Sequence, residues 1–64
     1  MRLMEKSDDS FAIELTRDEL RILANAVNEV CNGPEAIEGP EFDTRMGATR
    51  EEAEALLDAL NKAR

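Results

Sequence analysis

Apolar residues recur at helical spacing in two long stretches of the chain. The first stretch follows Thr16, and its apolar stripe consists of Leu20, Leu23, Ala24, Val27, Val30 and Cys31. Thr16 and Glu19 have the spacing of a capping box, which predicts that this helix begins at Arg17. The Asn-Gly-Pro sequence that follows is a typical stop signal, so we expect the helix to end near Asn32, with Gly33 in the left-handed conformation.

A second stretch near the end of the chain repeats this pattern. Thr49 and Glu52 have the same Thr-x-x-Glu spacing, and the apolar face that follows consists of Ala53, Leu56, Leu57, Leu60 and Ala63. The pattern predicts a second amphipathic helix that begins after Thr49. Both helices are expected to bury one face and expose the other.

Strand signals precede both helices. Residues 11–15 alternate in polarity, with one side formed by Phe11, Ile13 and Leu15. Residues 41–47 alternate more weakly, with one side formed by Phe42, Thr44 and Met46. Because two strands do not make a stable sheet alone, we expect a third strand, either from residues 2–6 folding back through the turn-like Ser-Asp-Asp-Ser sequence or from a second subunit.

These elements predict one small α+β domain over residues 1–64, in the order strand, helix, loop, strand, helix. The two amphipathic helices are expected to pack on a small sheet, with residues 1–10 either disordered or forming an edge strand. The loop, residues 33–41, contains two Gly-Pro steps that hold the chain extended or turned.

The length of the chain indicates self-association. A domain of 64 residues has a small core, and this chain has only two aromatic residues to fill it, Phe11 and Phe42. One cysteine permits no internal disulfide, and without histidine it forms no zinc site. We therefore expect a homodimer, with a candidate dimer face at Ile22 and Ala26, which lie off the core stripe of the first helix.

The net negative charge of the chain makes some classes of binding partner unfavourable. The net charge is −7, from 15 acidic and 8 basic residues, and this balance disfavours nucleic acids and anionic membrane surfaces. We expect neither among the partners. No segment has the apolar length of a signal peptide or a membrane span, so we expect a cytoplasmic protein with a basic protein partner.

Chemical motifs do not indicate an enzyme. Cys31 lies in the apolar stripe of a chain without histidine, and it is expected to act as a small hydrophobic residue. The carboxylates lack the alternating spacing of a calcium loop, and the sequence has no phosphate-binding or nucleophile motif. We therefore predict a non-enzymatic protein without catalytic residues, cofactor or metal.

Two polar clusters are candidate sites. Acidic residues in the loop and the second predicted strand are candidates for binding a partner, namely Glu35, Glu38, Glu41 and Asp43. The alternative is that they form only a solvated surface. Asparagines on one flank of the first helix are expected to tie the loop to it through their amides, namely Asn25, Asn28 and Asn32. The alternative role of this asparagine flank is a ligand or partner site.

Three segments of the chain carry a resemblance to known proteins. ELTRDEL, NEVCNG and EFDTRMGATREEAEALLDAL together resemble a group of small bacterial proteins that share a capped helix, an EFxTRxG strand and a Glu-rich helix. The resemblance spans roughly residues 14–60. It implies a compact fold without implying an activity.

A second resemblance concerns the start of the second helix. MGATREEAEALL is similar to the corresponding segment of ribbon-helix-helix repressors and antitoxins, and FAIEL to their dimerising strand, which implies a DNA-binding dimer. The long loop between the helices and Glu14 on the polar face of the strand depart from that pattern. We therefore expect a non-enzymatic acidic protein-interaction module, with a ribbon-helix-helix-like or antitoxin-like DNA-binding regulator as the alternative.

Overall fold

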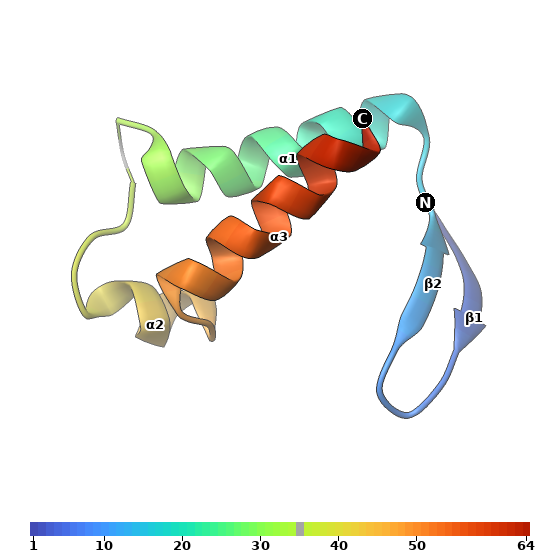
Figure 1. Cartoon of the computed structure of the whole chain (residues 1–64), viewed down its shortest axis with the longest axis horizontal. Coiled ribbons are helices and arrows are strands. Elements are labelled where there is room, and N and C mark those ends of the chain that lie inside the picture. Colours follow the sequence, from blue (N-terminus) through green and yellow to red (C-terminus); the bar gives the residue numbers. More distant parts are fainter. Residues whose placement is uncertain (35) are drawn as a thin grey trace.

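The computed structural model describes residues 1–34 and 36–64, and Glu35 lies outside the described part. In these residues, a β-hairpin is followed by three helices (Figure 1). The strands are β1 (Arg2–Lys6) and β2 (Phe11–Glu14), and the helices are α1 (Arg17–Asn32), α2 (Glu41–Met46) and α3 (Arg50–Ala63). The predicted α+β class is confirmed.

The two long helices begin where their capping boxes predict. The Thr16 hydroxyl accepts a hydrogen bond from the Glu19 N–H at 3.1 Å, and the Glu19 carboxylate accepts one from the Thr16 N–H at 2.9 Å. Thr49 and Glu52 make the same reciprocal pair at the start of α3. Each box therefore satisfies N–H groups that have no partner within the helix.

The C-terminal end of α1 lies at Asn32, as predicted, but the conformation of Gly33 differs from the prediction. Gly33 has φ −74° and ψ 173°, which is extended rather than left-handed. Its N–H donates to the Glu29 carbonyl at 3.1 Å. A Cβ atom on Gly33 would lie only 2.8 Å from the same carbonyl oxygen. The position needs glycine because of this close backbone approach.

The prediction of a strand at residues 41–47 is wrong, because residues 41–46 form the short helix α2. Phe42 is its buried residue, and its other side chains are exposed. A strand here would need a neighbouring strand to pair with its backbone groups, whereas a helix pairs some of them within itself. Gly47 ends the helix in the left-handed conformation, with φ 69°, and donates to the Asp43 carbonyl at 2.9 Å.

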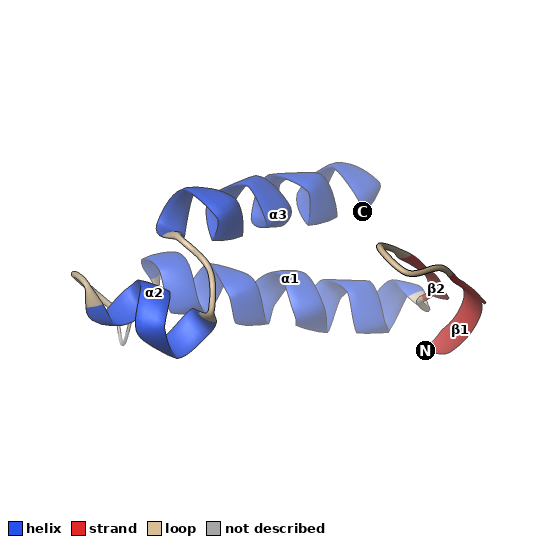
Figure 2. Cartoon of the chain, turned by 90° about the horizontal axis from the view of Figure 1, so that it is seen from below, coloured by secondary structure: helices blue, strands red, loops and turns tan. Residues whose placement is uncertain are grey.

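Residues 2–6 form the extra strand that was one of the two predicted options. β1 and β2 pair antiparallel, with Leu3 opposite Ile13 and Lys6 opposite Phe11. The turn is closed by the Ser7 N–H, which donates to the Ser10 carbonyl at 2.9 Å. All residues of both strands are exposed, so the predicted packing of the helices on the sheet does not occur. The hairpin instead projects beyond the start of α1 (Figures 1 and 2).

The core lies between α1, α2 and α3 at the end of the molecule remote from the hairpin (Figure 2). It consists of Cys31, Phe42 and Ala53, with three partly buried residues packed against it: Val27, Val30 and Ile37. Phe42 is its largest buried side chain, with 1% of its surface exposed. Cys31 is buried in this cluster, as the sequence predicts.

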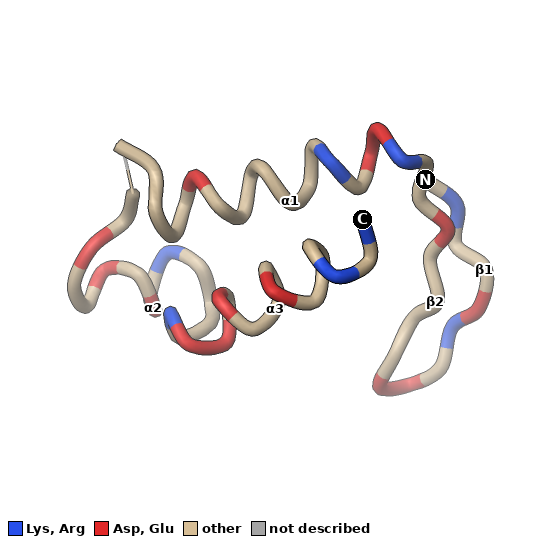
Figure 3. The backbone as a smooth tube through the Cα atoms, turned by 45° about the horizontal axis from the view of Figure 1, so that its top comes forward, with Lys and Arg blue, Asp and Glu red and all other residues tan. Residues whose placement is uncertain are grey.

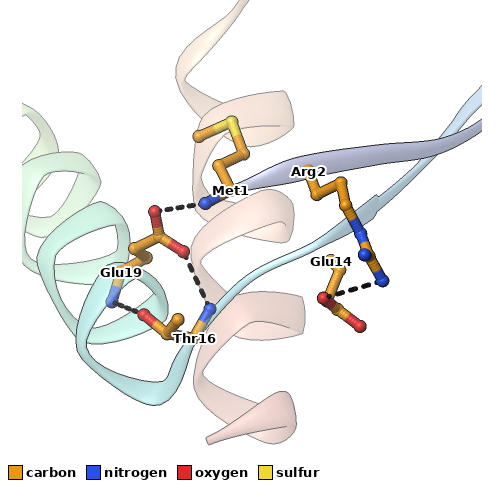
Figure 4. A network of polar contacts seen from close by, with 5 residues as sticks. All are labelled: Met1, Arg2, Glu14, Thr16 and Glu19. Atoms are coloured by element: carbon orange, nitrogen blue, oxygen red, sulfur yellow. Dashed lines mark hydrogen bonds and ion pairs between the residues drawn. The ribbon is translucent and has the colours of Figure 1, made fainter.

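The fold lowers the pKa values of the two capping carboxylates, Glu19 and Glu52. The Met1 ammonium group donates to the Glu19 carboxylate, and this contact, with the Thr16 N–H, lowers the pKa of Glu19 from its ordinary value of 4.5 (Figure 4). The Thr49 N–H lowers the pKa of Glu52 in the same direction. The fold therefore stabilises the deprotonated, charged form of both carboxylates.

We expect the free energy of unfolding to fall as the pH drops through the lowered pKa values of Glu19 and Glu52. Their contribution is complete above the unfolded pKa of about 4.5, and it is lost once both groups are protonated in the folded state. Glu19→Gln keeps an acceptor for the Thr16 N–H but removes the charge. Urea titrations between about pH 7 and about pH 3 should show a smaller loss of stability for this variant than for the wild type.

The matched control is Glu54→Gln, which removes a carboxylate that is exposed on α3. This variant should keep the pH dependence of the wild type. Identical pH profiles for Glu19→Gln and the wild type would contradict the role of the capping carboxylate.

Candidate functional site

One side chain joins the three segments at the core end of the molecule. Arg50, the first residue of α3, donates from Nη1 to the Cys31 carbonyl at 2.8 Å and from Nη2 to the Ile37 carbonyl. Its guanidinium carbon lies 4.5 Å from the centroid of the Phe42 ring. Arg50 therefore contacts the last turn of α1, the connector between α1 and α2, and α2 itself. The connector is the described part of residues 33–40. We call this set of contacts the Arg50 clamp.

Helix electrostatics explain the position of the Arg50 clamp. The last carbonyls of a helix lack partners and carry partial negative charge, and α1 has no basic residue in its own last turn. Arg50 supplies that charge from α3. A cation at the start of α3 is unfavourable for that helix, but Glu51 and Glu52 in the same turn offset it. The planar guanidinium can donate in two directions while its face lies over an aromatic ring.

The connector between α1 and α2 is held by the backbone as well. The Ala36 N–H donates to the Gly33 carbonyl at 3.0 Å, and the Ile37 N–H donates to the Val30 carbonyl at 3.1 Å. Both backbone polar groups of Ile37 are therefore hydrogen-bonded, since its carbonyl accepts from Arg50. These contacts fix the direction in which the connector leaves α1.

The predicted role of the asparagines as ties for this connector is not what the described contacts show. Asn25, Asn28 and Asn32 are all exposed. Asn32 Nδ2 donates to Asn28 Oδ1 at 3.1 Å, which links two turns of α1. In the described part of the chain, the Arg50 clamp and the backbone hydrogen bonds hold the connector instead.

The acidic candidates fall on two different elements. Glu38 lies in the connector, and Glu41 and Asp43 lie in the first turn of α2, whereas Glu35 lies outside the described residues. The three described side chains are exposed. Within residues 1–34 and 36–64, the ion pairs involve other carboxylates: Glu14, Asp18, Glu19 and Asp58. We call Glu38, Glu41 and Asp43 the acidic end.

The acidic end and the hairpin lie at opposite ends of the molecule (Figure 3). Residues 41–46 form a short helix and not a strand. They therefore present no strand edge beside these acids. Any partner of the acidic end would be recognised through side chains rather than through strand addition.

Apolar side chains are exposed on two other surfaces. Ile22 and Ala26, the candidate dimer face from the sequence, are both exposed on α1, and Ile22 has 60% of its surface exposed. Leu3, Phe11 and Ile13 are exposed on the hairpin. Dimerisation stays a prediction, with two surfaces that could support it.

The hollows in the surface offer little enclosure for a small ligand. One hollow, of about 380 Å³, lies where the start of α1 meets the end of α3 and is lined by Leu15, Thr16, Arg17, Leu20, Ala63 and Arg64. Among the described residues, there is no group of three or more histidine, cysteine, aspartate or glutamate side chains placed to hold a metal ion. Within the same residues, no helix combines the length and the apolar character needed to span a membrane.

Comparisons of the chain with protein-family models, curated proteins and solved structures gave no match. The resemblances to small bacterial proteins and to ribbon-helix-helix proteins therefore stay expectations. A function has to be inferred from the contacts, charges and exposed surfaces of the chain itself.

Arg50 was not among the residues singled out from the sequence. Arg17 occupies the same place in α1, directly after a capping threonine, yet Arg17 is exposed and Arg50 is partly buried. A basic residue in the acidic first turn of a helix is the signal that could have drawn attention to Arg50. That signal does not separate Arg50 from Arg17, because the difference depends on tertiary contacts.

We expect Arg50→Met to lower the free energy of unfolding by about 2–3 kcal/mol, because two carbonyl groups lose a charged donor and Phe42 loses its cation. Arg17→Met is the matched control, and its effect should stay within about 0.5 kcal/mol. Urea titrations followed by circular dichroism measure both. Equal effects of the two substitutions would contradict the Arg50 clamp.

Proposed function

We propose that the protein is a non-enzymatic interaction module that binds a basic protein through the acidic end. The observation that supports this proposal is that exposed carboxylates without ion-pair partners in the described chain lie on segments held by the Arg50 clamp. A cytoplasmic location is part of the proposal.

A fixed acidic surface has a physical advantage in binding. Carboxylates that are not already neutralised attract a basic partner over several ångströms and increase the rate of association. The Arg50 clamp holds Ile37, the neighbour of Glu38, before any partner arrives, so less conformational entropy is lost on binding. Both effects favour recognition by the surface as it stands.

The arrangement of polar groups favours binding over catalysis. In the described part of the chain, the buried residues are Ala24, Cys31, Phe42 and Ala53, and no polar or charged residue is buried with them. Catalytic acids and bases usually depend on a partly buried site that shifts their pKa values. The lowered pKa of Glu19 is explained by its contact with the Met1 ammonium group and by its role as a helix cap, and the lowered pKa of Glu52 by its role as a helix cap.

The alternative of a ribbon-helix-helix regulator has less support. In that family the strand pairs with the strand of a second subunit, whereas β2 pairs with β1 of the same chain. The strand pairs on the polar side of the hairpin are Arg2 with Glu14 and Glu5 with Ala12. The two carboxylates on that side outnumber the one basic residue, Arg2, so its net negative charge repels phosphate groups and a protein partner fits better than DNA.

We expect charge removal at the acidic end to abolish capture of the partner. The variant Glu38→Gln, Glu41→Gln, Asp43→Asn removes three charges without adding bulk. The control variant Glu51→Gln, Glu54→Gln, Asp58→Asn removes three exposed charges from α3. In pull-downs from native lysate, a basic protein should be captured by the wild type and the control but not by the acidic-end variant.

Raising the salt concentration should weaken this capture, because exposed charges are screened. Circular dichroism must show that both variants keep their helices. If both variants capture the same proteins with the same salt dependence, the acidic end is not the binding surface.

Duplex DNA is expected not to bind measurably at physiological salt, because a chain with a net charge of −7 gains little from the release of counterions. Fluorescence anisotropy with labelled duplexes of mixed and palindromic sequence measures this. Salt-dependent binding tighter than about 1 μM would favour the regulator over the interaction module.

A further inference from the structure

One face of the hairpin is mostly apolar, and nothing in the described chain covers it. Directly paired residues lie on the same face of a sheet, and so do residues two apart on one strand. Leu3 pairs with Ile13, and Phe11 lies two residues before Ile13, so the three share a face, and Lys6, which pairs with Phe11, lies on the same side of the hairpin. Phe11 is 60% exposed, Leu3 56% and Ile13 50%. We call these three residues the hairpin face.

The chain as a whole exposes more surface than a compact monomer. Its accessible surface is 5144 Å², whereas a folded monomer of 7.1 kDa is expected to expose about 4,100 Å². Its radius of gyration is 13.0 Å, against about 11 Å for a compact domain of this length. This excess of about 1,000 Å² belongs to the whole chain, and a standard protein interface buries roughly 800 Å² of each partner.

The hairpin also has little support from the rest of the chain. It is tied to α1 by the contact between the Met1 ammonium group and Glu19, while the Arg2–Glu14 ion pair lies within the hairpin (Figure 4). An isolated two-stranded hairpin is marginally stable in water. Covering the hairpin face would therefore stabilise the hairpin as well as bury its apolar side chains.

We propose that the hairpin face binds the hairpin face of a second copy of this chain, forming a twofold symmetric dimer. Charge supports a second copy as the occupant. The chain carries a net charge of −7, but within the two strands Arg2 and Lys6 balance Glu5 and Glu14. Two copies can therefore approach through these strands with less repulsion than through their acidic elements.

The surplus surface and the apolar character of the face agree with this occupant. An isologous interface uses the same patch on both chains, so one apolar face is enough to form it. The proposal does not depend on the acidic end, which lies at the opposite end of the molecule and stays free in such a dimer (Figure 3).

The rival dimer surface is the candidate face at Ile22 and Ala26 on α1. Asp18 and Glu29 lie at helical spacing on either side of that face, and both are exposed. Asp18 is paired with Arg21, but Glu29 has no ion pair among the described residues, so pairing two copies through this face would place an unpaired carboxylate from each chain in the interface. The paired residues on the hairpin side include no carboxylate, and their one charged side chain is that of Lys6.

Sedimentation equilibrium of two substituted proteins tests the proposal. Phe11 and Ile22 are a matched pair for substitution, because both are 60% exposed and they lie on the two rival faces. The wild type should have twice the chain mass of 7.1 kDa at micromolar concentration. Phe11→Asp should raise the dimer Kd by roughly 30-fold or more, the effect of losing a central interface residue. Ile22→Asp should leave the Kd within about threefold of the wild type.

A wild type that stays monomeric up to about 100 μM would overturn the proposal, since standard interfaces bind more tightly than this. So would a dimer that survives Phe11→Asp, or one that Ile22→Asp dissociates. Phe11 lies outside the core cluster, so the helical circular dichroism of Phe11→Asp should persist and show that the helices remain folded.

A second measurement does not depend on disrupting the interface. Phe11→Cys and Leu56→Cys each place a thiol at an exposed apolar position, and the native Cys31 is buried. Under mild oxidation, Phe11→Cys should form disulfide-linked dimers at least about tenfold faster than Leu56→Cys, because the dimer holds its thiols close together. Equal rates of cross-linking would overturn the proposal.

Discussion

The fold depends most on the contact of one guanidinium group with three segments of the chain. Arg50 lies over the ring of Phe42 and donates to the carbonyls of Cys31 and Ile37. The core beneath it contains a single large buried side chain, that of Phe42, so apolar burial alone holds α2 weakly. The guanidinium adds hydrogen bonds and a cation–π contact where the apolar core is thin.

The Arg50 clamp divides the molecule into a supported end and an unsupported end. At the supported end, α1, the connector, α2 and α3 converge, and the acidic end is fixed on the outside of them (Figure 1). At the other end, the hairpin exposes Leu3, Phe11 and Ile13 beyond the start of α1. The proposed partners follow this division, with a basic protein at the acidic end and a second copy at the hairpin face.

Local signals in the sequence predicted the two long helices well, because each capping box is complete within four residues and specifies its own geometry. They failed at α2, where alternation over six residues with one buried Phe42 fits a short helix as well as a strand. The Arg50 clamp could not be predicted at all, since Arg17 has the same local context. What separates the two arginines is the position of α1 beside the start of α3.

Amide hydrogen exchange at Ile37 in the variant Arg50→Lys tests the Arg50 clamp most directly, because lysine keeps the charge but cannot donate from a planar fork. The Ile37 N–H bonds to the Val30 carbonyl, and the Leu20 N–H, which bonds to the Thr16 carbonyl, is the internal reference. Exchange at Ile37 should become at least about tenfold faster while exchange at Leu20 changes little, since local opening no longer has to break the guanidinium contacts. Unchanged protection of Ile37 would show that the backbone holds the connector without Arg50.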